Sequence, residues 1–132
     1  MSATRPNVLA VGATLPEWSI DVTTRLVVTT ALSTRDYQDV HHDRDAATGA
    51  GSKDIFLNIL TSQGLVQRYV NEQLGDVFIS SMSVRLGAPA YPGDTMTFTG
   101  EVLGESAGTY EVKVVGAVPL GDHVTATVKV KP

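Results

Sequence analysis

The sequence predicts an α+β fold, a single domain in which a curved antiparallel sheet wraps around one long central helix. Its 132 residues suffice for one hydrophobic core without crosslinks. Apolar residues recur at helical spacing from about Ile55 to about Gln73. After Gly75, apolar and polar residues alternate in several segments, and this period of two indicates strands with one buried and one solvated face.

The N-terminal region is expected to hold an irregular arm followed by a strand. Two prolines bracket a short apolar stretch, so we assign residues 1–17 to the arm and residues 18–132 to the folded domain. From Trp18 to Thr34 the β-branched residues dominate, which favours extended structure.

The central region is expected to form a short helical turn and then the long helix. Residues 46–49 favour the turn, after which two glycines break the chain, and Ser52 or Asp54 can cap the next helix. The apolar residues of that helix extend beyond one narrow stripe, so we expect it to be buried over most of its circumference. They are Ile55, Phe56, Leu57, Ile59, Leu60, Leu65, Val66, Tyr69 and Val70.

Four strands are expected after the long helix, separated by turns rich in proline and glycine. The apolar helix and the four strands, each with one apolar face, can all bury their apolar surface if the sheet wraps around the helix. This arrangement is known as the hotdog fold. An open sheet edge usually pairs with another copy, so a dimer is expected. The inward-facing residues of the clearest strands are Met96, Phe98 and Val102; Tyr110, Val112 and Val114; and Val124, Ala126, Val128 and Val130.

Composition excludes several classes of function. The net charge of −4 and the pI of about 5.2 argue against nucleic acid as a partner, because phosphate binding needs a basic face. No apolar run reaches the length of a membrane span, and the first residues lack the pattern of a signal peptide. The chain has no cysteine, which removes disulfides, thiol nucleophiles and zinc–thiolate sites. A cytoplasmic protein is therefore expected.

Residues 36–45 are the strongest candidate for chemistry. They read Asp-Tyr-Gln-Asp-Val-His-His-Asp-Arg-Asp and hold two of the three histidines and four of the fourteen acidic residues. Carboxylates and imidazoles are the groups that move protons near neutral pH. The pair of most interest is Asp36 and His41. A merely solvated loop remains the alternative at this point, because Asp is common in turns and at helix starts.

Three other features are expected to have no chemical role. Residues 48–53 only partly match a phosphate-binding loop, because the GxxxxGK[ST] spacing is absent. No metal site is expected at His41, His42 and Asp43, since adjacent histidines tend to point apart. His123 begins a strand with no acidic partner nearby in sequence, so we expect a surface residue. No Ser-His-acid triad follows from spacing.

The stretch from Asp36 to His41 resembles the signature Asp-x-Asn-Pro-(Ile/Leu/Val)-His of the MaoC-like (R)-specific enoyl-CoA hydratases, also called hydratase 2. The match covers the Asp, the apolar position at Val40 and the His. The chain differs at Gln38 and Asp39, where that family has Asn and Pro. In the family the signature follows the first long strand.

Longer segments are similar to a narrower group, the small MaoC-like subunits of the actinobacterial heteromeric steroid side-chain hydratases. The likeness covers nearly the whole chain after residue 17, and residues 85–95 look like the family's strand–turn–strand element. The most specific segments are residues 34–45, 51–55, 58–61, 65–70 and 120–128.

The resemblance implies an enoyl-CoA hydratase, a hydro-lyase that adds water across the C=C bond conjugated to a CoA thioester. The implied substrate is a steroid with an unsaturated three-carbon side chain, formed during cholesterol or other sterol breakdown. Asp36 would orient and deprotonate water, and His41 would carry the proton to the α-carbon. The backbone N–H of Asn58, where the family has Gly, would stabilise the thioester oxyanion. Gln38 would position the loop or contact substrate.

The same resemblance implies a partner, because one short hotdog domain leaves little room for four fused rings. That partner would be a larger MaoC-like hotdog subunit, giving an α2β2 heterotetramer, and the chain would be active only with it. No cofactor or metal is implied. Candidates to bind the CoA phosphates are Arg35, Arg44, Lys53 and Arg68.

Two alternatives remain open. A hotdog thioesterase or a homodimeric hydratase would act on simpler acyl-CoA substrates. The thioesterase would need a carboxylate on the central helix, where Glu72 is poorly placed near the end. A non-catalytic scaffold subunit is the alternative from a different class, although a scaffold has no need of both Asp36 and His41.

Overall fold

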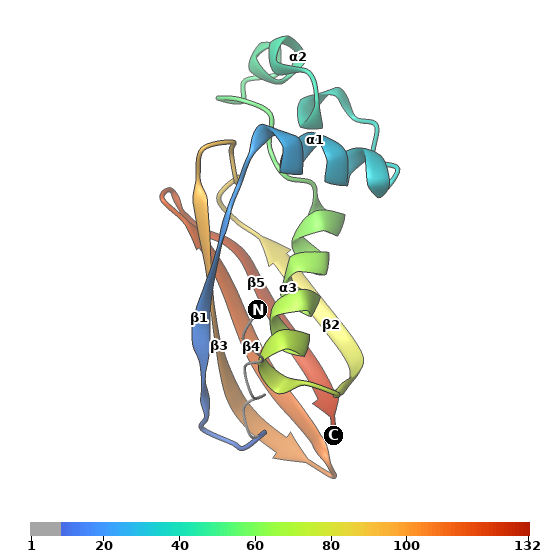
Figure 1. Cartoon of the computed structure of the whole chain (residues 1–132), viewed down its shortest axis with the longest axis vertical. Helices are drawn as coiled ribbons and strands as arrows, with labels where there is room; N and C mark the ends of the chain where they lie inside the picture. Colours follow the sequence, from blue (N-terminus) through green and yellow to red (C-terminus); the bar gives the residue numbers. More distant parts are fainter. Residues whose placement is uncertain (1–8) are drawn as a thin grey trace, which may run out of the picture.

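The computed structural model describes residues 9–132, and in this part of the chain five antiparallel strands form one sheet, with the order β1-β3-β4-β5-β2. Figure 1 shows the helix α3 lying across one face of this curved sheet. The predicted α+β hotdog fold is confirmed. The strands are β1 (Thr14–Asp21), β2 (Phe78–Leu86), β3 (Thr95–Ser106), β4 (Thr109–Val118) and β5 (Gly121–Lys131); the helices are α1 (Thr24–Ser33), the 3₁₀ turn η1 (Asp39–His41), α2 (Arg44–Gly49) and α3 (Ile59–Leu74).

The core lies between α3 and the inner face of the sheet. The predicted alternation is confirmed over most of β3 to β5, with every second residue buried from Met96 to Val102, from Val112 to Val118 and from Val124 to Val130. The ring of Tyr69 on α3 stacks on Phe98 of β3 at a centroid distance of 5.8 Å. Its hydroxyl donates to the carbonyl of Pro16 at 2.6 Å, which ties α3 to β1. Burial, together with the nearby charge of Glu17, raises the pKa of Tyr69 to about 12. Each large apolar side chain buried here contributes about 1.5–3 kcal/mol.

The strand predicted from Trp18 to Thr34 is wrong beyond Asp21. The strand β1 instead begins at Thr14, inside the segment assigned to an arm, and residues 24–33 form the helix α1. The Thr23 hydroxyl caps this helix by accepting the N–H of Leu26 at 3.0 Å. Its threonines and serine are accommodated because their hydroxyls donate to carbonyls one turn earlier. These hydroxyls belong to Thr29, Thr30, Ser33 and Thr34.

The long helix begins later than predicted and is buried on one face only. Residues 55–58 are not helical, and Asn58, rather than Ser52 or Asp54, caps α3. The buried face carries residues spaced three and four apart, such as Ser62, Val66 and Tyr69. The opposite face is open, and Leu60 there is 47% exposed. The predicted burial around most of the circumference is therefore wrong.

Two further features position the site. The predicted turn at residues 46–49 is confirmed as part of α2, which Asp43 caps by accepting the N–H of Ala46. In Figure 1, α1 and α2 gather at the end of the molecule where α3 begins. None of the helices within residues 9–132 combines the length and apolarity that a bilayer crossing requires.

Candidate active site

The site is built where α1 ends, because the chain turns sharply there to bring Asp36 over the start of α3. Arg35 takes a left-handed backbone conformation, with φ of 58°. Its N–H donates to the carbonyl of Leu32 at 3.0 Å, and the N–H of Asp36 donates to the carbonyl of Ala31 at 2.9 Å. This pair of bonds is the Schellman motif, which satisfies the last carbonyls of a helix. The backbone of Asp36 is thus fixed directly to α1.

The carboxylate of Asp36 is held from three directions and its side chain is 23% exposed. Its Oδ1 accepts the backbone N–H of Gln38 at 3.3 Å. Its Oδ2 accepts the side-chain Nδ2–H of Asn58 at 3.2 Å and lies 3.4 Å from Nε2 of His41. The two residues singled out from the sequence therefore do face each other.

The tautomer of His41 follows from its surroundings. Its Nδ1 lies 2.7 Å from the carbonyl of Phe56, which can only accept, so Nδ1 carries a proton. The Phe56 ring meets the imidazole edge to face at 5.0 Å, and the His41 side chain is 6% exposed. The nitrogen that faces Asp36 is therefore the one that can gain or lose a proton. Catalytic hydrogen bonds are often longer in the free enzyme, which accommodates the distance of 3.4 Å.

Asn58 links the site to the first turn of α3. Its Oδ1 accepts the backbone N–H of Thr61 at 3.2 Å and also the Thr61 hydroxyl. Its Nδ2 donates to the hydroxyl oxygen of Thr34 at 2.8 Å as well as to Asp36. The side chain of Asn58 is buried, since the residue is only 2% exposed. In an α-helix the first backbone N–H groups have no acceptor within the helix, so the N–H of Ile59, the first residue of α3, is available to a ligand.

A second buried histidine, His123 on β5, contacts the first turn of α3. The expectation that His123 is a surface residue is therefore wrong. It is 2% exposed on β5, with Nδ1 at 2.8 Å from the carbonyl of Ala88 and Nε2 at 2.7 Å from the Ser62 hydroxyl. Burial lowers the pKa of His123, against opposing effects from the Ala88 carbonyl and from Asp94. A neutral ring donating to Ala88 and accepting from Ser62 satisfies every polar atom, so this pair supports the helix.

The four cations proposed for the CoA phosphates differ in their surroundings. Arg44 is bound to Asp54 at 2.8 Å, and Arg68 is bound to Glu72 at 3.0 Å. Arg68 also stacks over Trp18, ten residues along α3 from Asn58, a rise of about 15 Å. The ammonium of Lys53 lies 5.8 Å from the ring centroid of Tyr91. Arg35 is exposed and adjacent to Asp36 in the chain, which makes it the candidate nearest the site.

The histidines of the acidic stretch do not converge. His41 faces Asp36, whereas Nε2 of His42 lies 3.7 Å from Asp39. Within residues 9–132, no group of three or more ligating side chains could hold a metal ion.

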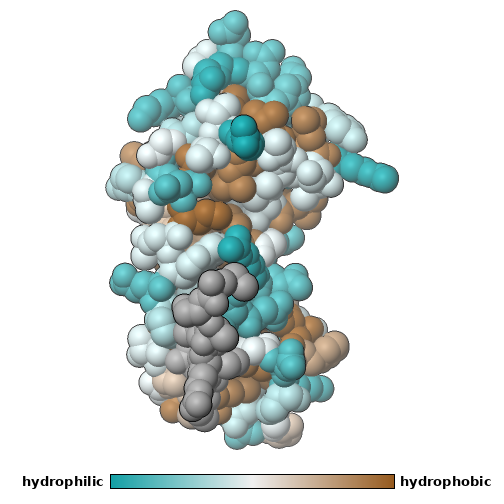
Figure 2. All heavy atoms as spheres, in the orientation of Figure 1, coloured by the Kyte–Doolittle hydropathy of each residue, from teal (hydrophilic) through white to brown (hydrophobic). Residues whose placement is uncertain are grey.

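A groove opens beside the site, between the open face of α3 and the strand β2. It has a volume of about 530 Å³, within the usual range for ligand pockets. Thr34, which binds Asn58, forms one wall, and Leu60 and Met82 give the groove an apolar lining. Figure 2 shows hydrophilic side chains over α2 at the top of the molecule and apolar side chains in patches below.

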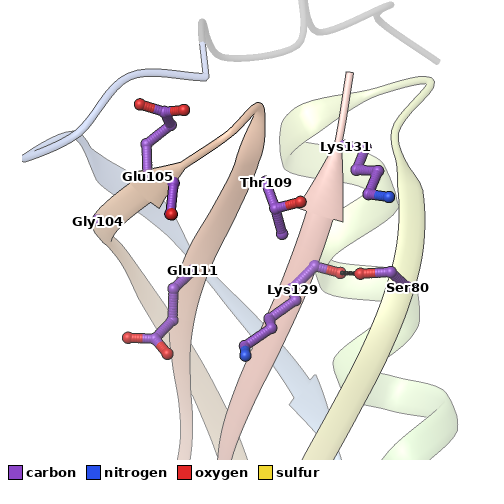
Figure 3. A pocket seen from close by; sticks show the side chains of 8 residues that line it. Ser80, Gly104, Glu105, Thr109, Glu111, Lys129 and Lys131 are labelled. Atoms are coloured by element: carbon purple, nitrogen blue, oxygen red, sulfur yellow. Dashed lines mark hydrogen bonds between the residues drawn. The ribbon is translucent and has the colours of Figure 1, made fainter.

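A hollow of similar size, about 550 Å³, lies far from the catalytic pair, at the other end of the sheet. Figure 3 shows Lys129, Lys131 and Glu111 on the face turned away from α3, with the Ser80 hydroxyl donating to the Lys129 carbonyl at 3.2 Å. These solvated charges surround no buried polar group, so we assign this hollow no role.

With this geometry established, comparisons with known proteins identify the family. A family model described as the MaoC-like domain matches residues 10–124. The chain belongs to the MaoC-like domain family. The resemblance seen in the sequence is confirmed.

Relatives in this family include a close one. The beta subunit of 3-oxo-4,17-pregnadiene-20-carboxyl-CoA hydratase from Mycobacterium tuberculosis is 58% identical over 120 residues, which is 90% of this chain and 93% of the relative. A chain in the crystal structure of the ChsH1–ChsH2 complex from M. tuberculosis superposes with a TM-score of 0.90 at 55% identity, covering 94% of this chain and 98% of that one. An (R)-hydratase from A. caviae involved in PHA biosynthesis has a TM-score of 0.84 at 19% identity, covering 93% of this chain and 96% of that one, and shares the fold.

Sequence reasoning missed three parts of the site. It assigned no role to Phe56, whose carbonyl sets the tautomer of His41, or to Thr34, which binds Asn58. It also missed the contact between Ser62 and His123, which are 61 residues apart. A buried serine and histidine so far apart leave no signal in spacing, because only the packing of α3 on β5 brings them together.

Proposed function

We propose that this MaoC-like chain is the catalytic subunit of a heteromeric enoyl-CoA hydratase acting on a steroid enoyl-CoA with an unsaturated three-carbon side chain. The observation that carries the proposal is the Asp36–His41 pair, with Oδ2 and Nε2 3.4 Å apart at the start of α3. The relative that is 58% identical is named as the beta subunit of a steroid carboxyl-CoA hydratase. A scaffold subunit would not need this pair.

The geometry fits an acid–base addition of water. The cycle begins with a proton on each ring nitrogen of His41 and with Asp36 ionised. Asp36 takes a proton from the water molecule as the water oxygen bonds to the β-carbon, and His41 gives the proton on Nε2 to the α-carbon and becomes neutral. The proton gained by Asp36 returns to His41 across the same 3.4 Å contact, so the pair is restored after each turnover. One water molecule is consumed and no net proton is released.

Negative charge on the thioester oxygen needs fixed donors. The backbone N–H groups of Asn58 and Ile59, at the start of α3, supply them in this proposal. The partial positive charge of a helix N-terminus adds to the effect. Arg35 is our first choice for a CoA phosphate, because Arg44 and Arg68 already have carboxylate partners.

The steroid and the partner subunit share the groove between α3 and β2 in this proposal. The groove is open, and Leu60 at its wall is 47% exposed, so the chain alone does not enclose an apolar ligand. A larger MaoC-like subunit, with two copies of each chain, would close it. The similar M. tuberculosis chain was crystallised in a complex of ChsH1 with ChsH2, which supports a partner subunit. A CoA thioester carries phosphate charges that cannot cross a bilayer unaided, so we place the enzyme in the cytoplasm.

The test is turnover by substituted complexes. Asp36→Asn and His41→Ala should each lower the hydration rate of a steroid enoyl-CoA by roughly 10²- to 10⁴-fold, the contribution of general acid–base groups. The complex should still assemble, because neither side chain lies in the core between α3 and the sheet. His42→Ala, which removes the exposed neighbouring histidine, is the matched control and should retain activity. Near-normal turnover in both Asp36→Asn and His41→Ala would place the active site elsewhere.

A further inference from the structure

We propose that the side chain of Asn58 is a positioning residue, which holds Oδ2 of Asp36 toward His41. The inference rests on the proposed hydration, in which Asn58 otherwise contributes only its backbone N–H. Its basis is the contact of 3.2 Å between Asn58 Nδ2 and Asp36 Oδ2, which joins two segments 22 residues apart.

The orientation of the Asn58 amide is determined by its partners. The Thr34 hydroxyl donates its own proton to the carbonyl of Thr30, so it can only accept from Asn58. The carboxylate of Asp36 also only accepts, whereas the backbone N–H of Thr61 needs an acceptor. The amide nitrogen must therefore face Asp36 and Thr34. With both N–H groups and the oxygen engaged in a residue 2% exposed, the side chain is held rigidly.

This rigid donor restricts the rotation of the carboxylate. Without it, the only short contacts left to the Asp36 carboxylate would be the Gln38 N–H at 3.3 Å, on the other oxygen, and the 3.4 Å contact with His41 itself. The carboxylate could then rotate about its Cβ–Cγ bond. The 3.4 Å separation between Oδ2 and His41 is already at the long end for proton transfer. A displacement of about 1 Å from productive geometry can cost 10²-fold in rate. Asn58 therefore acts on the chemical step and not on substrate binding.

Asn58 also caps α3, so the test must separate capping from positioning. Asn58→Asp and Asn58→Ser both keep an oxygen that can accept the N–H of Thr61, and both keep the backbone N–H. Both lose the Nδ2–H group that donates to Asp36, and the shorter serine side chain ends at Oγ, one bond short of that position. Thr23→Ala is the matched control, because Thr23 caps α1 in the same way but has no contact with Asp36.

The experiment measures kcat, KM and the pH–rate profile of each variant, co-purified with the partner subunit, on a steroid enoyl-CoA. We expect kcat to fall by about 10²-fold in Asn58→Asp and Asn58→Ser with KM close to the wild-type value. The acid limb of the profile should also move to higher pH in Asn58→Asp, because two carboxylates then lie side by side. Thr23→Ala should keep the wild-type kcat.

A double substitution decides whether Asn58 acts through Asp36. In an Asp36→Asn background, adding Asn58→Ser should change the residual rate little, since the group being positioned is already lost. Wild-type kcat in Asn58→Ser, or a loss that multiplies fully with that of Asp36→Asn, would overturn the inference while leaving the proposed function intact. Full activity in Asp36→Asn alone would instead refute the proposed active site, and the inference with it.

Discussion

At the scale of single residues, the candidate site depends on an arginine in an unfavourable backbone conformation. Arg35 has a φ of 58°, at the position after a helix where glycine is preferred. This turn brings the carboxylate of Asp36 to 3.4 Å from Nε2 of His41. A non-glycine residue at this position costs stability, which is consistent with the proposed role of the Arg35 charge in binding a CoA phosphate.

Arg35→Gly should therefore separate stability from binding. We expect the free energy of unfolding to rise by about 0.5–1 kcal/mol, because glycine adopts a left-handed φ without strain. We also expect KM for the CoA thioester to rise, because a cation is lost. Chemical denaturation and steady-state kinetics measure the two effects.

Ala107→Gly is the matched control for Arg35→Gly. Ala107 has a φ of 52° in the turn between β3 and β4, so the substitution should give a similar stability gain and leave KM unchanged. An unchanged KM in Arg35→Gly would show that Arg35 does not bind a CoA phosphate and that another cation does.

His123 supplies a prediction for pH dependence. Burial lowers its pKa in the folded protein, so between that value and the ordinary one near 6.5 the unfolded chain binds more protons. The stabilising contribution is thus complete above about pH 6.5 and is lost as the pH falls through the folded-state pKa. His123→Gln should reduce the loss of stability between about pH 7.5 and about pH 5, as followed by thermal unfolding. Thr23→Ala is the control, because it removes the cap of α1 but no titratable group, and it should keep the wild-type slope.

At the scale of elements, the packing of α3 on the sheet depends on a close approach at Gly100. A Cβ there would lie 2.9 Å from Leu15 Cδ1 and 3.0 Å from Tyr69 Cε2. Neither neighbour can move easily, because both are buried and the Tyr69 hydroxyl is bound to Pro16. Gly100→Ala should therefore destabilise the protein by about 1–3 kcal/mol.

The control for Gly100→Ala lies in the same strand. A Cβ at Gly104 would have no atom within 4 Å, so Gly104→Ala should change the free energy of unfolding far less. Equal effects of the two substitutions in chemical denaturation would show that loss of glycine in β3, and not the contact with α3, is responsible.

The elements also show where prediction from sequence succeeded and failed. The strands β3 to β5 were predictable because one face of the sheet is buried and the other is exposed to solvent. Apolar and polar residues therefore alternate along each strand. The helix α1 was not, because its threonines favour strands in isolation, and its inward pair Val27 and Ala31 is a signal of only two residues. The Asp36–His41 pair was predictable from a motif. The contacts of the Asn58 side chain with Asp36 and of His123 with Ser62 were not predictable. They form only when α3 packs against α1 and the sheet.

At the scale of the whole molecule, the open face of α3 predicts that the chain needs a partner subunit for turnover. The groove between α3 and β2 lies beside Thr34, and so beside the carboxylate that Asn58 holds. The strand β2 lies at one end of the sheet order, where its outer edge can pair with another chain. A partner that covers this face would complete the wall around the substrate. The chain alone should therefore turn over a steroid enoyl-CoA weakly or not at all, whereas the co-purified complex should be active.

Leu60→Glu tests which face the partner covers, by placing a charge in the groove. Leu60 is 47% exposed, so the folded chain should tolerate the substitution, whereas a covered interface should not. We expect Leu60→Glu to abolish co-purification with the partner subunit and turnover together. Leu103→Glu is the matched control, because Leu103 is 44% exposed but lies on β3, away from the groove.

The comparison of the lone chain with the complex also tests the alternative function. If the chain without its partner matched the complex in turnover, a homodimeric hydratase for simpler acyl chains would be the better account.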